Sequence, residues 1–212
     1  YLEKGKQYEI YFNHTCVYLE PLSVRLAWTT PSMYEKAMAE AEQAARESDV
    51  AIVFAWHQSV SDRLSLEENQ DELISRVAAA NPHTVVVLNN GDAVEMPWQD
   101  QVPAILEMWF SGQEGTRATL AVLEGAVNPA GRLPVTFPKK LEDLAARDPK
   151  HPERYAPSGR ISEKDAKHPN TAYFTEGLLN GYRWFDAMDK EPLYPFGYGL
   201  SYTTFAYGAL ET

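Results

Sequence analysis

An apolar run decides the fold of this chain: Val50-Ala51-Ile52-Val53-Phe54-Ala55-Trp56. Two similar stretches follow along the chain, at residues 84–88 and 104–110. Continuous apolar runs that are rich in β-branched residues and bounded by polar loops are typical of strands in a parallel sheet. We therefore expect residues 50–56 to form a strand that is buried on both faces.

Helical patterns lie before and between these strands. Ser32 and Glu35 form a capping-box pair that predicts a helix through residues 33–45. Ser65 and Glu68 repeat the pair and predict a helix that starts there and ends before residue 82. Helices between consecutive parallel strands are the usual crossover connection.

The remaining elements complete the pattern. A further helix is predicted at about residues 113–124, ending at Gly125, and a fourth short strand at residues 133–137. The order predicts the α/β fold class: a three-layer αβα sandwich with an open, largely parallel sheet. Two strands at residues 7–12 and 23–28 form a short β segment before it. Residues 139–171 read as a long irregular loop.

Composition excludes several function classes. The chain has 212 residues, of which 44% are hydrophobic and 23% charged, with a formal net charge of −11. This charge repels nucleic acid and anionic membrane surfaces, and no apolar run reaches the roughly 20 residues of a membrane helix. The single Cys16 excludes an internal disulfide framework. Phosphate-binding glycine motifs, HExxH and GxSxG are all missing from the sequence.

The loop after the first strand is the place to look for a site, because ligands of parallel sheets bind where strands end. It begins with Trp56 and His57 and closes with Asp62 and Arg63. His57 is a candidate proton carrier near neutral pH. Asp62 and Arg63 either bind sugar hydroxyls or order the loop as a salt bridge.

Motifs in consistent order along most of the chain resemble one known family, the glycoside hydrolase family 3 β-glucosidases, in their C-terminal α/β-sandwich domain. The resemblance rests on the stretches at residues 49–53, 61–63, 69–74, 79–89, 96–98, 112–115, 128–138, 176–177, 181–183 and 195–203. It implies three regions: residues 1–31 as terminal strands of an inserted protective-antigen-like β-sandwich, residues 32–204 as the α/β-sandwich domain, and residues 205–212 as the entry to a fibronectin-type-III-like domain.

The resemblance implies a retaining β-glycosidase that removes terminal non-reducing β-linked sugars. In that family the nucleophile is an Asp on a (β/α)8 barrel, which lies outside this chain. The family acid/base is a Glu just before the Asp-Arg pair, and Ser59 holds that position here. His57, Asp62 or a residue of another domain are the candidate substitutes. Trp56, Asp62 and Arg63 are the implied sugar-binding residues.

Two functions from different classes follow. The first is one wall of a β-glycosidase sugar pocket, with this chain alone inactive and the barrel supplied by the remainder of the same polypeptide or by another chain. The second is a non-catalytic carbohydrate-binding or scaffold protein that has lost the acid/base Glu. The expected partner is a β-linked glycoside or oligosaccharide, and no cofactor or metal is expected. A cytoplasmic or secreted location and an oligomer all stay open.

Overall fold

The computed structural model describes residues 5–7, 29–57, 63–155 and 173–209. The predicted strands at residues 7–12 and 23–28 fall almost wholly outside these ranges, as do Ser59 and Asp62 of the candidate loop. The chain divides into two compact units, Tyr1–Lys36 and Ala37–Thr212. The sheet and the candidate site belong to the second unit.

The first predicted helix is confirmed as α1, Pro31–Arg46. Its cap differs from the prediction, since the hydroxyl of Thr30 accepts a hydrogen bond from the Met33 N–H at 3.2 Å. Pro31 then occupies the first helical position, where a missing N–H costs nothing. The cap is therefore Thr30 rather than Ser32.

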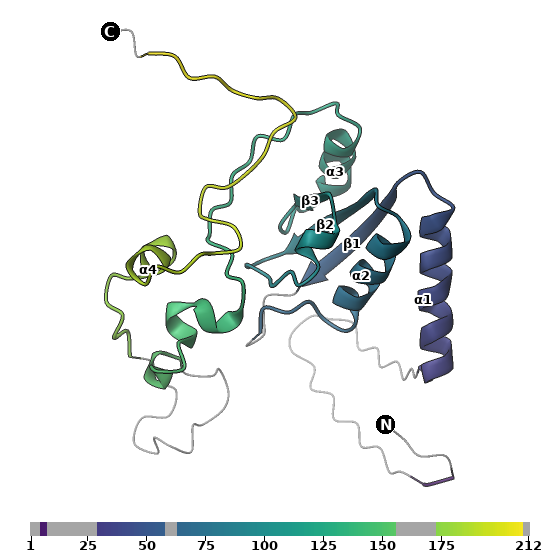
Figure 1. Ribbon diagram of the computed structural model, residues 1–212, viewed down its shortest axis with the longest axis horizontal. Coiled ribbons are helices and arrows are strands. Elements are labelled where there is room, and N and C mark those ends of the chain that lie inside the picture. Colours follow the sequence, from purple (N-terminus) through teal and green to yellow (C-terminus); the bar gives the residue numbers. More distant parts are fainter. Residues whose placement is uncertain (1–4, 8–28, 58–62, 156–172, 210–212) are drawn as a thin grey trace. The chain divides into compact units, whose positions relative to one another are not determined.

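The centre of the second unit is a parallel three-stranded sheet in the order β1-β2-β3 (Figure 1). The strands are β1 at Ala51–His57, β2 at Thr84–Asn90 and β3 at Ala104–Glu107. Helix α2, Gln70–Ala80, connects β1 to β2, and α3, Gly115–Leu123, follows β3. The predicted α/β class, with an open parallel sheet flanked by helices, is confirmed for these strands.

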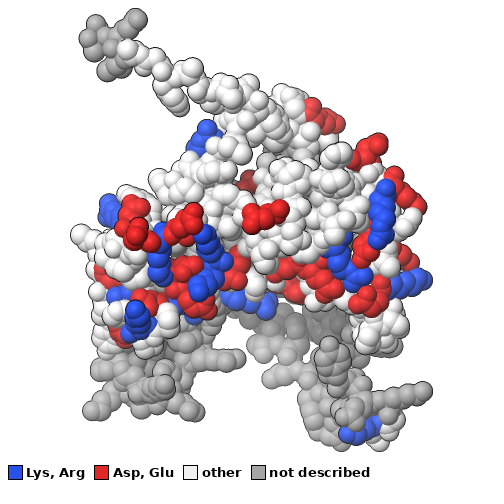
Figure 2. Space-filling model, in the orientation of Figure 1, with Lys and Arg blue, Asp and Glu red and all other residues white. Residues whose placement is uncertain are grey.

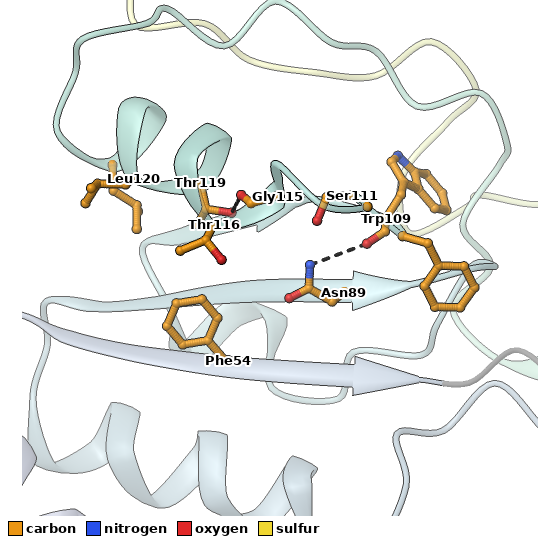
Figure 3. A pocket seen from close by; sticks show the side chains of 11 residues that line it. Phe54, Asn89, Trp109, Ser111, Gly115, Thr116, Thr119 and Leu120 are labelled. Atoms are coloured by element: carbon orange, nitrogen blue, oxygen red, sulfur yellow. Dashed lines mark hydrogen bonds between the residues drawn. The ribbon is translucent and has the colours of Figure 1, made fainter. Parts of the chain in front are cut away.

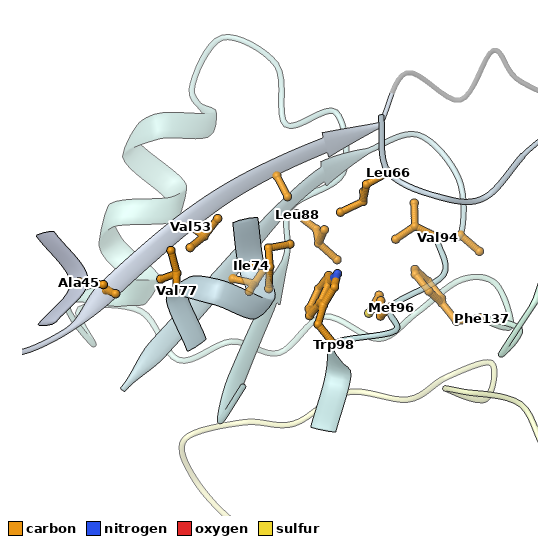
Figure 4. Packing of buried hydrophobic residues seen from close by; sticks show 14 residues of the cluster. Ala45, Val53, Leu66, Ile74, Val77, Leu88, Val94, Met96, Trp98 and Phe137 are labelled. Atoms are coloured by element: carbon orange, nitrogen blue, oxygen red, sulfur yellow. The ribbon is translucent and has the colours of Figure 1, made fainter. Parts of the chain in front are cut away.

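One face of the sheet carries the main core (Figure 4). Val53 of β1 and Leu88 of β2 pack there with Ile74 of α2. Trp98 is fully buried beside them, and its indole N–H donates to the Asp71 carboxylate at 2.8 Å. Apolar side chains of the strands and of α2 thus bury the same surface, which is the main favourable contribution to folding.

The prediction that β1 is buried on both faces is wrong for this chain. Alternate residues are buried, from Ala51 to His57, and the residues between them are exposed. The reason is that α2 covers one face only, while the other face of β1 has an open hollow over it. An unbroken apolar sequence cannot distinguish a strand covered by its own chain from one left open.

Helix α2 begins later than the capping-box pattern indicates. Residues 65–69 form a bend and a turn, in which Glu68 takes the left-handed conformation with φ of 55°. Helical backbone cannot pass through that angle. Leu66, predicted on the helix, lies in this segment and is nevertheless buried in the core.

The predicted strand at residues 133–137 is also wrong in the described structure, which shows a single antiparallel bridge between Phe137 and Tyr194. The Leu133 N–H donates to the Tyr198 carbonyl at 2.8 Å, so the two segments touch at intervals. Prolines at 134 and 138 cannot donate a ladder hydrogen bond, which limits regular pairing.

The predicted irregular loop after residue 138 consists, in its described part, of short 3-10 turns. These are Leu141–Asp143, Ala145–Arg147 and Pro152–Arg154, and a further 3-10 turn, Gln99–Gln101, lies before β3. The last helix, α4, spans Tyr182–Ala187 and buries Trp184 and Phe185 against this region.

Within the described ranges, no helix is both long and apolar enough to cross a membrane. On the face drawn in Figure 2, acidic and basic side chains lie interspersed, as on the surface of α1. Such mixing is typical of a solvated surface rather than of a nucleic-acid interface.

Candidate functional site

The carboxyl ends of the three strands lie side by side at one edge of the sheet. In the register of the ladder His57 is opposite Asn90, and Leu88 is opposite Glu107. Residues in register on parallel strands point to the same face, as do residues two apart on one strand. His57, Asn90 and Glu107 therefore share one face at the edge where ligands of such sheets bind.

His57 ends β1 with its ring inside the protein. The side chain is 1% exposed, and its Nδ1 lies 3.0 Å from a carboxylate oxygen of Glu67. When the imidazole is protonated, this arrangement is a buried ion pair. Proton exchange at His57 is thus coupled to Glu67, and the ring does not face solvent.

Trp56 lies on the other face of β1, with its side chain partly open to solvent. The amide of Gln70 pairs with its backbone: Oε1 accepts the Trp56 N–H and Nε2 donates to the Trp56 carbonyl, both at 2.9 Å. These two hydrogen bonds fix the end of β1. An indole on a rigid strand end offers an apolar face of the kind that stacks on a sugar ring.

Of the predicted site residues, Trp56, His57 and Arg63 lie in the described ranges and bracket the loop. Arg63 is exposed. Ser59 and Asp62 lie outside the described residues, so their predicted roles stay predictions. Trp56 and His57 point to opposite faces, so they do not meet.

Glu107 is a candidate that the sequence reasoning missed. One of its carboxylate oxygens accepts the Trp109 N–H at 2.8 Å, and the other is buried with no hydrogen-bond partner among the described residues. Burial raises the pKa of Glu107 to about 7, against the opposing effects of the Trp109 N–H and the Asn90 side chain. The available signal was a lone Glu inside an apolar run.

Trp109 follows β3 in a left-handed backbone conformation with φ of 52°. Two side chains hold its backbone: Glu107 accepts its N–H, and the Asn89 amide donates to its carbonyl at 3.4 Å. The Trp109 ring packs near the Phe137 ring, with centroids 6.0 Å apart. A bulky residue in this region is strained, and such strain persists only when neighbours enforce it.

A hollow of about 610 Å³ lies over the sheet face that carries Phe54 (Figure 3). Phe54 of β1, Asn89 of β2 and Leu120 of α3 line it. Because Phe54 and Val53 are consecutive, this hollow and the α2-covered core lie on opposite faces. The lining is mostly apolar, with few groups for chemistry.

Within the described ranges, no group of three or more His, Cys, Asp or Glu side chains is placed to hold a metal ion. The arrangement can bind and orient, through Trp56 and Arg63, and can hold a proton, through His57 or Glu107. These residues do not bring two carboxylates together in the arrangement that glycoside hydrolysis needs.

Comparison with known proteins bears on this geometry. A profile of the glycosyl hydrolase family 3 C-terminal domain matches residues 4–202. β-Glucosidase B of Emericella nidulans is 41% identical over 199 residues, which cover 88% of this chain and 23% of that protein.

Solved structures agree. DesR, a β-glucosidase from Streptomyces venezuelae in complex with D-glucose, is 42% identical with a TM-score of 0.74, over 84% of this chain and 22% of that chain. β-Glucosidase 3B from Thermotoga neapolitana in complex with glucose is 33% identical with a TM-score of 0.67, over 82% and 24%. The chain spans less than a quarter of the length of each of these relatives.

Proposed function

The chain belongs to the glycosyl hydrolase family 3 C-terminal domain family, and from this premise we propose that it forms one wall of the sugar pocket of a retaining β-glycosidase. The single observation that carries the proposal is the match over residues 4–202. Because the relatives are more than four times longer, we propose that the nucleophile-bearing barrel lies in the rest of the polypeptide. The sandwich then extends to three layers, over residues 32–204.

The proposed sugar contacts are at the end of β1. Trp56 stacks on the sugar, and Asp62 with Arg63 binds its hydroxyls. The support is geometric for Trp56, whose backbone is fixed by Gln70 while its side chain stays partly open. The nucleophile attacks the anomeric carbon, and a second group protonates the leaving oxygen and then activates water.

The acid/base group is the open step of this mechanism, because Ser59 stands where the family has Glu. A serine hydroxyl cannot act as a general acid near pH 7, and losing such a group costs roughly a hundred- to ten-thousand-fold in rate. His57 and Asp62 are the candidate replacements in this chain. The burial of His57 beside Glu67 favours a role in holding the strand end over direct proton donation, which leaves Asp62 or a group of another domain as the donor.

The test measures hydrolysis by the complete polypeptide of aryl β-glucosides with good and poor leaving groups. Ser59→Glu should raise turnover on poor leaving groups far more than on nitrophenyl glucosides, because only the former need protonation. Ser61→Glu, two residues on, is the matched control and should give no such selectivity. Equal effects of Ser59→Glu on both substrate classes would refute the assignment.

A second function, non-catalytic carbohydrate binding, is favoured by the same Ser59. It predicts that the complete polypeptide binds glucose by titration calorimetry but releases none from activated glucosides. Release of nitrophenol at a measurable rate excludes this alternative, and absence of both binding and turnover excludes both functions.

A further inference from the structure

The open face of β1 is apolar. Ile52, Phe54 and Trp56 are 45%, 62% and 47% exposed, and Val50 just before the strand is also exposed. Edge strands that stay in solvent usually carry charges, proline or bulges, which prevent pairing with other chains. Residues 50–56 contain none of the charged or proline residues that serve this purpose.

The outer edge of β1 also has free backbone groups at defined positions. The Ala51 N–H donates to the His83 carbonyl at 3.2 Å, towards β2. In a parallel ladder alternate residues direct both backbone groups to the same neighbour. Ile52, Phe54 and Trp56 therefore direct theirs away from β2, where the described sheet has no further strand.

Gln70 distinguishes Trp56 from the other two. Its side-chain amide occupies both outward groups of Trp56, as a neighbouring strand would. The remaining open stretch therefore ends before Trp56 and is centred on Ile52 and Phe54. It has the length of a short strand, with its boundary set by a specific side chain.

Hollows adjoin this stretch. One, of about 400 Å³, lies between α1 and β1, with Ala41 of α1 and Ile52 among its lining. The other is the hollow of about 610 Å³ between Phe54 and α3. Both are lined largely by apolar side chains, so filling them with apolar groups is favourable.

We propose that a further strand of the same polypeptide, from outside residues 1–212, pairs with β1 along Ile52 and Phe54 and buries their side chains. This rests on the proposed function in one respect, that the chain is part of a longer protein. The occupant is intramolecular because the matched relatives hold more than three quarters of their length outside the matched region. A second copy of the chain is the competing occupant.

Hydrogen exchange of the complete polypeptide, resolved to single amides by mass spectrometry, tests the pairing. The amides of Ile52 and Phe54 should exchange at least about 100-fold more slowly than unpaired amides, as those of Val53 and Ala55 do. Fast exchange at Ile52 and Phe54 beside slow exchange at Val53 and Ala55 would overturn the proposal. Protection that rises with protein concentration would overturn it in favour of a second copy.

A pair of variants tests the burial of the side chains. Phe54→Lys should speed exchange at Ile52 at least about tenfold, because a buried lysine opposes docking of the strand. Leu178→Lys places the same charge on another exposed apolar residue and should leave Ile52 unchanged. Equal exchange in both variants contradicts the proposal. Loss of glucosidase activity alone would contradict the proposed function and leave this result standing.

Discussion

Glu107 gives the sharpest prediction, because burial raises its pKa from 4.5 to about 7. The folded chain thus holds this proton more tightly than the unfolded chain does. Each pKa unit is worth about 1.4 kcal/mol, so the full shift corresponds to about 3 kcal/mol. The contribution of Glu107 is most favourable below pH 4.5, falls as the pH rises, and reaches its full cost above pH 7.

Glu107→Gln removes the ionisable group and keeps an oxygen that can accept the Trp109 N–H. The free energy of unfolding of the variant, relative to the parent, should therefore increase by about 3 kcal/mol between pH 4.5 and pH 7.5. Denaturation of the chain in urea at a series of pH values measures this difference. The comparison cancels the slopes of other carboxyl groups, such as Glu42, whose pKa is lowered by its hydrogen bonds to Arg76 and Arg46.

Two further measurements make the reasoning refutable. Glu124→Gln removes the same charge from an exposed position and should show little of this pH dependence. A ¹³C carboxyl titration reads the pKa of Glu107 directly in the folded protein. A titration midpoint near 4.5, or a constant stability difference between Glu107→Gln and the parent across the pH range, would contradict the assigned burial.

Three stability predictions follow from local contacts, each checked by urea denaturation. Gly115→Ala should destabilise by about 1 to 3 kcal/mol, because a Cβ there lies 2.8 Å from the Ser111 Cβ, and Ser111→Gly should restore part of the loss. Asn81→Ala should cost about 3 kcal/mol, since this buried amide makes three hydrogen bonds to backbone. Arg154→Ala should cost about 3 to 5 kcal/mol by leaving Glu176, 3.5 Å away and buried, without its cation.

Much of the fold could be predicted because its signals are local. The strands at β1 and β2 and the helices α1 and α3 appear within a few residues of their predicted positions, since each has a continuous apolar run or a helical stripe. The start of α2 could not, because the capping-box pattern at Ser65 and Glu68 competes with a turn in which Glu68 has a positive φ. That turn lets Leu66 reach the core.

The site was less predictable, because its residues meet through the register of the sheet. Nothing local marks Glu107 as a partner of Asn90 or as the group that holds Trp109. The predicted strand at residues 104–110 ends early at Glu107 for the same reason, since the strained Trp109 breaks the extended backbone. The pattern of residue types shows where a strand begins more reliably than where tertiary contacts end it.

The error at β1 is informative in the opposite direction. Residues 50–56 have the composition of a strand buried on both faces, and the described chain covers one of them. A sequence is shaped by the environment in which the strand works, so an apolar residue such as Phe54 on an open edge indicates a missing neighbour. The hydrogen bonds of Gln70 to Trp56 sharpen this argument, because they close the ladder at one residue and leave Ile52 and Phe54 open. A surface made for solvent would have no need of such selective closure.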